Sequence, residues 1–160
     1  MNWERHLVGA YETRSSIAQL VRPAFHRAAS DSEISRAEET LRCRLPRSLR
    51  FLLLQTNGVT EELQIENDLW IESGIVVYSV EEMIDANLYV RQAYPERNAD
   101  QYCYFSTAGT DGIQFGLRAR LNEQDDAAVF AWYPDQTREK RMADGLAFFL
   151  RDWCAGQATV

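Results

Sequence analysis

The sequence has few of the residues and patterns on which catalytic, metal-binding and membrane proteins depend. Its 160 residues include two histidines and three cysteines, and no two cysteines form a CxxC pair. This spacing predicts neither a zinc site nor a disulfide framework. No apolar run approaches the roughly 20 residues that a bilayer-spanning helix needs. GxSxG, HExxH, GxGxxG and phosphate-cradling glycine loops do not occur, so we expect neither a cofactor nor catalytic activity.

The few residues that could support catalysis stand in contexts that favour structural roles. Asp111 could pair with another carboxylate for acid–base chemistry, but its AGTDG context is typical of a turn. Cys103 and a distant histidine could form a nucleophilic pair, but the Tyr-Cys-Tyr context favours burial. His6 and His26 are too far apart along a continuous helix to share a metal ion. An enzyme or a small-ligand receptor is therefore the less favoured alternative.

The overall composition indicates a globular protein. Hydrophobic residues make up 46% of the chain and aromatic residues 11%, which argues against disorder. A chain of this length normally forms one domain, here expected to span residues 1–160. The N-terminal sequence MNWERHLVGAYETR lacks the charged start and apolar core of a secretory signal. We therefore expect a cytoplasmic protein with reduced cysteines.

Charge is distributed unevenly along the chain. Residues 1–60 contain nine arginines and six acidic residues, a balance of +3. Residues 61–160 contain eight basic and eighteen acidic residues, a balance of −10, and the two parts sum to −7. An acidic face commonly serves solubility alone, but it also suits a basic protein partner such as a nuclease domain. Direct binding of nucleic acid is disfavoured, because phosphate contacts need a basic patch.

Two groups of acidic residues are the candidates for a partner-binding surface. The first group consists of Glu61, Glu62, Glu66, Asp68 and Glu72, and the second of Asp125 and Asp126. Large aromatic residues on neighbouring strands are mostly expected in the core, where such side chains dominate. Any that face outward beside these carboxylates would suit a protein interface.

The segment 34–58 predicts two short amphipathic helices joined by a Leu-Pro elbow and closed by Asn-Gly. Ser30 and Glu33 form a capping-box pattern, so the first helix is expected to start there. Leu45 precedes Pro46, which ends the first helix and suits the first turn of the second. The apolar residues at helical spacing are expected in the core: Ile34, Ala37 and Leu41, then Leu49, Phe51, Leu52, Leu53 and Leu54.

The remaining elements predict an α+β fold with a mainly antiparallel sheet. An apolar stripe predicts that residues 3–29 are helical over much of their length, with a kink at Pro23. Strands are expected at 63–65, 69–71, 75–78, 102–107, 113–117 and 129–133, with Gly74 as a turn before the third and Ala108–Gly112 as a hairpin turn. A helix is expected after the Ser79–Glu82 capping box, and a final helix carries Leu146, Phe149, Leu150 and Trp153 against the sheet.

The helical signature and the elements that follow it resemble the SUKH superfamily, above all its bacterial members. The residues that match the family pattern, most of them expected to be structural, are Glu38, Leu41, Leu45, Pro46, Phe51, Leu52, Asn57, Gly58, Trp70, Asp111, Gly112 and Trp132. The resemblance covers residues 30–154. The chain departs from the pattern at Arg42-Cys43, where many relatives have a glycine, and at Leu49, where an aromatic residue is frequent. Both changes are conservative for packing and concern the subfamily, not the fold.

The resemblance implies a non-catalytic bacterial immunity protein that neutralises a cognate toxin of a polymorphic toxin system by occluding it. Such toxins are often nucleases, so the implied partner is a basic protein domain, and neither a cofactor nor a membrane is needed. A regulatory scaffold, like the fungal cell-wall assembly regulators of the same superfamily, is the alternative. The resemblance leaves open the identity of the toxin, the face that binds it and the oligomeric state.

Overall fold

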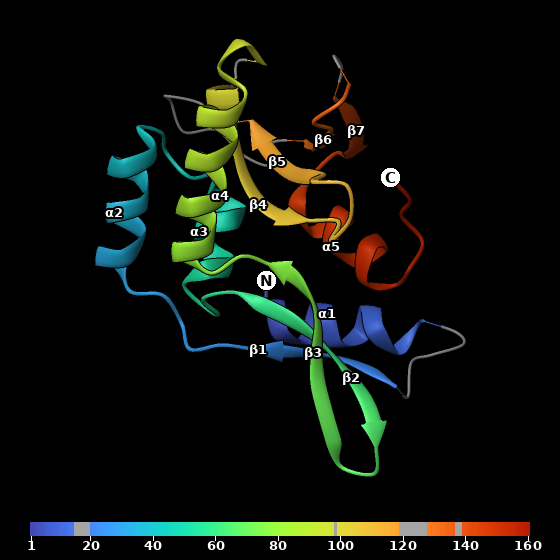
Figure 1. Cartoon of the computed structure of the whole chain (residues 1–160). Coiled ribbons are helices and arrows are strands. Elements are labelled where there is room, and N and C mark those ends of the chain that lie inside the picture. The colour runs from blue at the N-terminus through green and yellow to red at the C-terminus, as the bar shows by residue number, and fades with distance from the viewer. Residues whose placement is uncertain (15–19, 98, 119–127, 137–138) are drawn as a thin grey trace.

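The computed structural model describes residues 1–14, 20–97, 99–118, 128–136 and 139–160 (Figure 1). Its helices are α1 (Trp3–Glu12), α2 (Asp31–Leu41), α3 (Arg47–Leu53), α4 (Val80–Ala93) and α5 (Leu146–Cys154), with short 3-10 turns η1 (Pro95–Arg97) and η2 (Ala99–Gln101). Its strands are β1 (Val21–Phe25), β2 (Val59–Glu66), β3 (Leu69–Val77), β4 (Tyr102–Thr107), β5 (Gln114–Arg118), β6 (Val129–Trp132) and β7 (Lys140–Ala143). Within the described ranges, the strands form two antiparallel sheets in the orders β1-β2-β3 and β4-β5-β6-β7. The predicted α+β class is therefore confirmed, with two sheets in place of one.

The N-terminal region differs from the long helix that its apolar stripe predicts. The prediction is wrong beyond Glu12, where α1 ends, because the segment 21–25 is an edge strand paired with β2. Proline is tolerated at the edge of a sheet, so Pro23 sits in β1 opposite Glu61 and kinks no helix. The part of the prediction that concerns residues 15–19 lies outside the described residues.

The elbow between α2 and α3 forms largely as its local signals predict. Ser30 Oγ accepts a hydrogen bond from the Glu33 N–H at 3.2 Å, and the Glu33 carboxylate accepts one from the Ser30 N–H at 2.8 Å, which confirms the capping box. Pro46 then serves as the N-cap of α3. The exception is Phe51, which is 46% exposed, because the one face that this seven-residue helix turns inward carries Leu49, Leu52 and Leu53.

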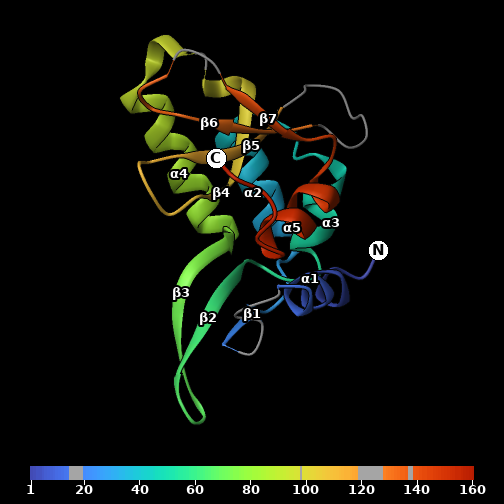
Figure 2. The ribbon, with the colours of Figure 1, turned by 90° about the vertical axis from the view of Figure 1, so that its right-hand side faces the viewer.

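Strands β2 and β3 form one long hairpin where three short strands are predicted. Gly74 lies inside β3, opposite Glu61, and does not form the predicted turn. The pairing register shifts beside this position, which is typical of a glycine at a β-bulge. The hairpin runs past the end of β1 and projects from the rest of the molecule (Figures 1 and 2).

Helix α4 lies along β4, an outer strand of the second sheet. The fully buried Asn87 donates a hydrogen bond from Nδ2 to the Tyr104 carbonyl at 2.7 Å and accepts one at Oδ1 from the Tyr104 N–H at 2.9 Å. The asparagine amide thus takes the place of a further strand. Covering an edge in this way prevents its backbone groups from remaining unpaired.

One hydrophobic cluster connects the helices to both sheets. In it the ring centroid of Phe149 on α5 lies 5.8 Å from that of Phe105 and 4.7 Å from that of Phe115, which confirms the predicted packing of the last helix. The two sheets meet where the Tyr78 N–H donates to the Phe105 carbonyl at 2.8 Å. Strand β7 is missing from the prediction, because its sequence KRMA has no apolar alternation.

Gly58 occupies a backbone position that no other residue fills without strain. Its φ is 100°, and a Cβ atom there would lie 2.9 Å from the Ser79 nitrogen. We expect Gly58→Ala to lower the free energy of unfolding by about 2 kcal/mol or more, because the left-handed backbone and the clash both oppose a side chain. Urea unfolding followed by circular dichroism measures this loss.

Gly9 in α1 provides the matched control. A Cβ atom at this position meets nothing within 4 Å, and alanine favours a helix over glycine. We expect Gly9→Ala to raise the free energy of unfolding by about 0.5–1 kcal/mol. A loss of stability of similar size in both variants would contradict the role assigned to Gly58.

Candidate functional site

The outer part of the β2–β3 hairpin, residues 61–74, is called the arm below. Its two strands are joined by Asn67 and Asp68, and Asp68 adopts a left-handed φ of 64°, a conformation that aspartate tolerates better than most residues. The ladder with β1 ends at Leu63, and the Gln64 N–H makes one further hydrogen bond, to the Leu20 carbonyl at 2.8 Å. The arm therefore presents both faces of a two-stranded ribbon away from the molecular body (Figure 2).

A polar contact consolidates one face of the arm. The Arg22 guanidinium carbon lies 4.0 Å from the centroid of the Trp70 ring, and Arg22 Nε donates to the Glu62 carboxylate at 2.8 Å. A cation above an indole ring is attracted by the ring's negative face. These three residues therefore connect β1, β2 and β3. Trp70, one of the family-motif residues, is half-buried beneath the arginine and does not lie in the core.

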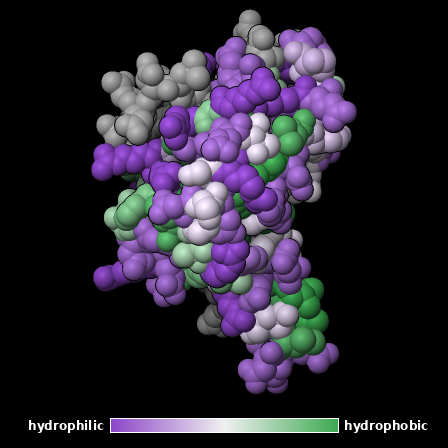
Figure 3. Space-filling view, turned by 90° about the vertical axis from the view of Figure 1, so that its left-hand side faces the viewer, coloured by the Kyte–Doolittle hydropathy of each residue, from purple (hydrophilic) through white to green (hydrophobic). Residues whose placement is uncertain are grey.

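The arm also carries a cluster of exposed aliphatic side chains. Ile65, Leu69 and Ile71 are 50%, 47% and 44% exposed. Figure 3 shows hydrophobic surface gathered over this projecting end, with hydrophilic surface at its extremity. Side chains alternate between the faces of a strand, which puts Leu69 and Ile71 on the face opposite Trp70. Clustered apolar side chains on a surface typically mark an interaction site.

The five acidic residues predicted in this region divide into two groups. Glu61 and Glu62 are bound within the fold, to Arg14 and Arg22 respectively. The exposed carboxylates of the other three, by contrast, have no ion-pair or hydrogen-bond partner in the described part of the chain; these are Glu66, Asp68 and Glu72. The second predicted group, Asp125 and Asp126, lies outside the described residues.

Glu61 is the centre of a polar contact at the base of the arm. It accepts a hydrogen bond from the Tyr11 hydroxyl at 2.9 Å and one from Arg14 Nη1 at 2.5 Å. Burial, supplemented by the nearby Cys154 and Glu61, raises the pKa of Tyr11 above its ordinary value, so the hydroxyl stays a donor. A cavity of about 260 Å³ adjoins these residues, slightly below the range of typical small-molecule sites. Three of the polar side chains that line this cavity, Tyr11, Arg14 and Glu61, are already hydrogen-bonded to one another.

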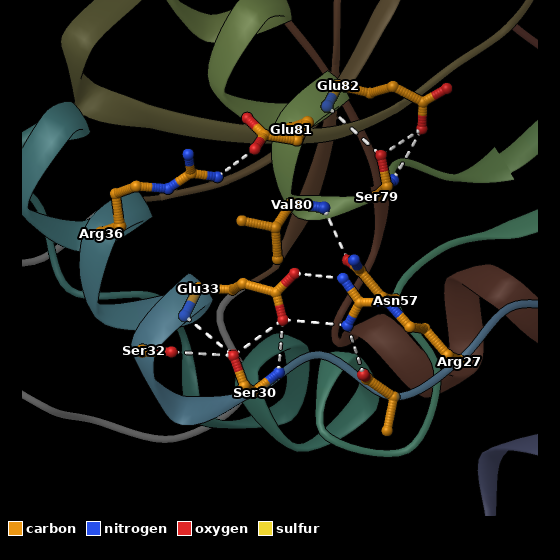
Figure 4. A network of polar contacts seen from close by, with 11 residues as sticks. Arg27, Ser30, Ser32, Glu33, Arg36, Asn57, Ser79, Val80, Glu81 and Glu82 are labelled. Carbon is orange, nitrogen blue, oxygen red and sulfur yellow. Dashed lines mark hydrogen bonds and ion pairs between the residues drawn. The ribbon is translucent and has the colours of Figure 1, made fainter.

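The family-motif residues Asn57 and Gly58 connect the start of α4 to the segment between β1 and α2. Asn57 Oδ1 accepts a hydrogen bond from the Val80 N–H at 2.7 Å, at the N-terminus of α4 (Figure 4). The Asn57 N–H donates to the Arg27 carbonyl at 2.6 Å. Figure 4 also shows the Ser79–Glu82 capping box at the start of α4, which is confirmed by reciprocal hydrogen bonds.

Glu38 closes the elbow between α2 and α3. Its carboxylate accepts hydrogen bonds from the Leu45 N–H at 3.0 Å and from Arg44 Nη1 at 2.7 Å. The side chain is 7% exposed, so it is engaged within the fold. Among the other family-motif residues, Leu41, Leu45, Leu52 and Trp132 are buried and Pro46 is the α3 N-cap, while Phe51 and Asp111 are exposed. Asp111 and Gly112 have φ values of 54° and 69° in the predicted β4–β5 turn.

Among the described residues, no hydrogen bond or ion pair joins Cys103 to a histidine or Asp111 to another carboxyl group. His6 Nε2 hydrogen-bonds the Ala147 carbonyl at 2.9 Å, and Cys103 is completely buried on β4. In the part of the chain that the structure describes, no group of three or more His, Cys, Asp or Glu side chains is arranged to hold a metal ion. None of the helices in the described ranges combines the length and apolarity that a bilayer crossing requires.

The exposed aliphatic cluster of the arm is the feature that the sequence interpretation missed. The strands 63–65 and 69–71 were placed correctly within β2 and β3, but apolar residues in strands are expected in a core by default. The available signal was the Asn-Asp pair between them, which makes the two strands one hairpin. A hairpin that projects as two strands has too little partner surface to bury its apolar side chains.

Substituting a paired and an unpaired acidic residue of the arm is expected to change the free energy of unfolding by different amounts. We expect Glu61→Ala to lower the free energy of unfolding by about 1–3 kcal/mol, because it leaves the half-buried Tyr11 hydroxyl and Arg14 without their acceptor. Glu72→Ala, the matched control on β3, is expected to change it by less than about 0.5 kcal/mol. Thermal and urea unfolding measure both, and equal losses would argue against this division.

Comparison with known proteins places this arrangement in a family. The chain matches the family model described as SMI1 / KNR4 family (SUKH-1) over residues 28–152. A search of curated proteins finds no match. The matched segment begins before α2 and ends within α5, so it includes the elbow, the arm and the second sheet. The resemblance to the SUKH superfamily is thereby confirmed, and the chain belongs to the SMI1/KNR4 (SUKH-1) family.

Proposed function

We propose that this protein is a non-catalytic immunity protein that binds a basic toxin domain through its arm and occludes it. Family membership supports the broader role of an immunity or regulatory protein-interaction module. The observation that favours a basic protein partner is the cluster of exposed aliphatic side chains, bordered by three carboxylates that have no partner among the described residues. On this proposal the chain acts as one domain, in the cytoplasm of the bacterium that makes the toxin.

The arm has the composition of a protein interface on a small scale. Interfaces combine an apolar centre, from which water is excluded, with a polar rim that sets specificity and association rate. Ile65, Leu69 and Ile71 supply the apolar centre. Glu66, Asp68 and Glu72 supply a rim of negative charge, which attracts lysine and arginine side chains.

A nuclease is the toxin class that such a rim suits best. Enzymes that bind nucleic acid hold its phosphates with clustered lysine and arginine side chains. Carboxylates on a projecting arm would pair with those same cations and cover the groove that the substrate needs. The mechanism needs no cofactor, because occlusion requires only a surface that is complementary in shape and charge.

The first test is titration calorimetry with the C-terminal domain encoded by the largest neighbouring gene, at two salt concentrations. We expect one-to-one binding that weakens as salt rises, since salt screens exposed charges. The triple variant Glu66→Gln, Asp68→Asn, Glu72→Gln is expected to raise Kd by about tenfold or more and to flatten the salt dependence. A toxin protection assay with the same variant should show a matching loss.

A matched triple variant controls for net charge. Glu4→Gln, Asp85→Asn and Asp100→Asn remove three exposed carboxylates from α1, α4 and η2, and they are expected to leave Kd nearly unchanged. Equal weakening by both triples would remove the arm from the proposal. Absence of binding by the unmodified protein would overturn its pairing with that toxin, and a pull-down that returns only non-toxin partners would favour the regulatory scaffold.

A further inference from the structure

The cavity beside Glu61 is enclosed by segments that lie far apart in the sequence. Its walls come from the end of α1 with Arg14, from β2 and β3 at the base of the arm, from the end of β4 with the turn that follows, and from the end of α5 with the C-terminal segment. Its volume is about 260 Å³, whereas sites for drug-sized ligands start at roughly 300 Å³. The cavity therefore suits a small metabolite and not a peptide or a nucleotide.

Two glycines keep this cavity open. Gly74 in β3 and Gly109 in the β4–β5 turn both line it, and a Cβ atom at either position would meet nothing within 4 Å. Gly74 is paired with Glu61, and paired residues on neighbouring strands share one face of the sheet. A side chain at position 74 would therefore project beside the Glu61 carboxylate and occupy the cavity. Glycine inside a strand is typical of a place where a ligand approaches the backbone closely.

The Glu61 carboxylate has an oxygen with spare capacity to accept hydrogen bonds. Its Oε2 atom accepts from Tyr11 and Arg14, as described above. Among the described residues, its Oε1 atom accepts only from Ser73 Oγ at 3.2 Å, and that hydroxyl lies at the same distance from the Glu61 carbonyl oxygen. One hydroxyl proton serves one of these two acceptors at a time, whereas a carboxylate accepts up to about four hydrogen bonds. Glu61 Oε1 can therefore accept from an ammonium group in the cavity.

The Arg14 guanidinium has unused donors on the side away from Glu61. Its carbon lies 5.8 Å from the centroid of the Tyr11 ring, and its Nη1 atom donates to Glu61. The Nε and Nη2 atoms have no hydrogen-bond partner among the described residues. A Cβ atom at Gly156, which also lines the cavity, would lie 3.5 Å from Arg14 Nε, so this edge of the guanidinium lies at the cavity wall. Nε and Nη2 together form the planar fork that binds a carboxylate with two parallel hydrogen bonds.

The charges of the cavity wall favour a ligand that carries one positive and one negative group. In the described part of the chain, Glu61 and Arg14 are the charged side chains that line the cavity, so the lining charges sum to zero. A ligand with a single charge would be attracted by one of the two and repelled by the other. A zwitterion leaves no charge of either kind unpaired. In an α-amino acid the ammonium and carboxylate groups are neighbours, as the carboxylate and guanidinium are in the wall.

We propose that this cavity binds a free α-amino acid with an apolar side chain. The ammonium group donates to Glu61 Oε1, and the carboxylate accepts from Nε and Nη2 of Arg14. The side chain contacts the apolar part of the wall, which includes Ile75, Ala108 and Trp153. The Trp153 ring is held in place by Phe115, whose ring centroid lies 4.7 Å away. This site goes beyond the proposed function, because it does not depend on a protein partner.

The test is a titration of the full chain with L-leucine, followed by the amide signals of Gly74, Gly109 and Gly156 in NMR spectra. We expect saturable one-to-one shifts of these three signals. Two analogues each lack one charged group: 3-methylbutylamine has no carboxylate, and 4-methylpentanoate has no ammonium. Each is expected to bind at least about tenfold more weakly than leucine. Equal affinity for either analogue would overturn the zwitterion. Absence of saturable shifts with leucine, methionine and phenylalanine at millimolar concentrations would overturn the site.

Two variants separate the roles of the wall. Gly74→Leu is expected to abolish leucine binding while leaving the circular dichroism spectrum unchanged, because a Cβ atom at this position meets no other atom. Arg14→Gln is expected to raise the Kd for leucine about tenfold or more, whereas 3-methylbutylamine should bind it no more weakly than it binds the unmodified protein. Leucine binding to folded Gly74→Leu with unchanged affinity would overturn the location of the site. An equal loss of both ligands in Arg14→Gln would overturn the role of Arg14.

The triple variant of the arm, Glu66→Gln, Asp68→Asn, Glu72→Gln, is the matched control. None of its three positions lines the cavity, so it is expected to bind leucine like the unmodified protein. Weakened leucine binding in this variant would assign the effect to the charge of the arm and overturn the cavity as its source. The same variant is expected to lose affinity for a basic protein partner, so the two proposals can fail independently.

Discussion

Asn57 joins segments of the chain that are far apart in sequence, and the positions of the other elements depend on it. Its side chain accepts from the first turn of α4, and its backbone N–H donates to the segment that leads from β1 into α2. The next residue, Gly58, directly precedes β2, and its carbonyl accepts a hydrogen bond from the His26 N–H at 3.4 Å. A short polar side chain followed by a residue without a Cβ atom permits this close crossing.

This crossing determines how α4 and the arm lie relative to each other. Helix α4 starts at Val80, whose N–H donates to Asn57, and runs along β4. There Asn87 completes the edge of the second sheet, and Arg91 donates to the carbonyl at the end of α2. The arm leaves the same crossing in the opposite direction (Figure 1).

The features that the sequence predicted correctly are those specified by a few neighbouring residues. Both capping boxes and the Asp-Gly turn are patterns within four or five residues, and each forms as expected. Pro46 precedes α3 as predicted, but α2 already ends at Leu41, where Arg42 adopts a left-handed φ of 52°, and not at Leu45. The segment 21–25 was misassigned because Pro23 and its apolar neighbours fit a kinked helix as well as an edge strand. Five acidic residues were identified near the arm, but which of them are free depends on Arg14 and Arg22, whose pairing is set by tertiary structure. The exposed aliphatic cluster likewise follows from how far β1 extends, which no local pattern records.

The irregular pairing of the arm has a consequence for self-assembly. A projecting ribbon with aliphatic side chains resembles the exposed edges through which β-proteins aggregate. The β2–β3 ladder is interrupted by three register shifts, which twist a ribbon and leave no long flat edge for another copy to extend. A second arm approaching the first would also bring like charges at Glu66, Asp68 and Glu72 into opposition. The carboxylates that we propose to attract a basic partner therefore also oppose pairing of the arm with a second copy of itself.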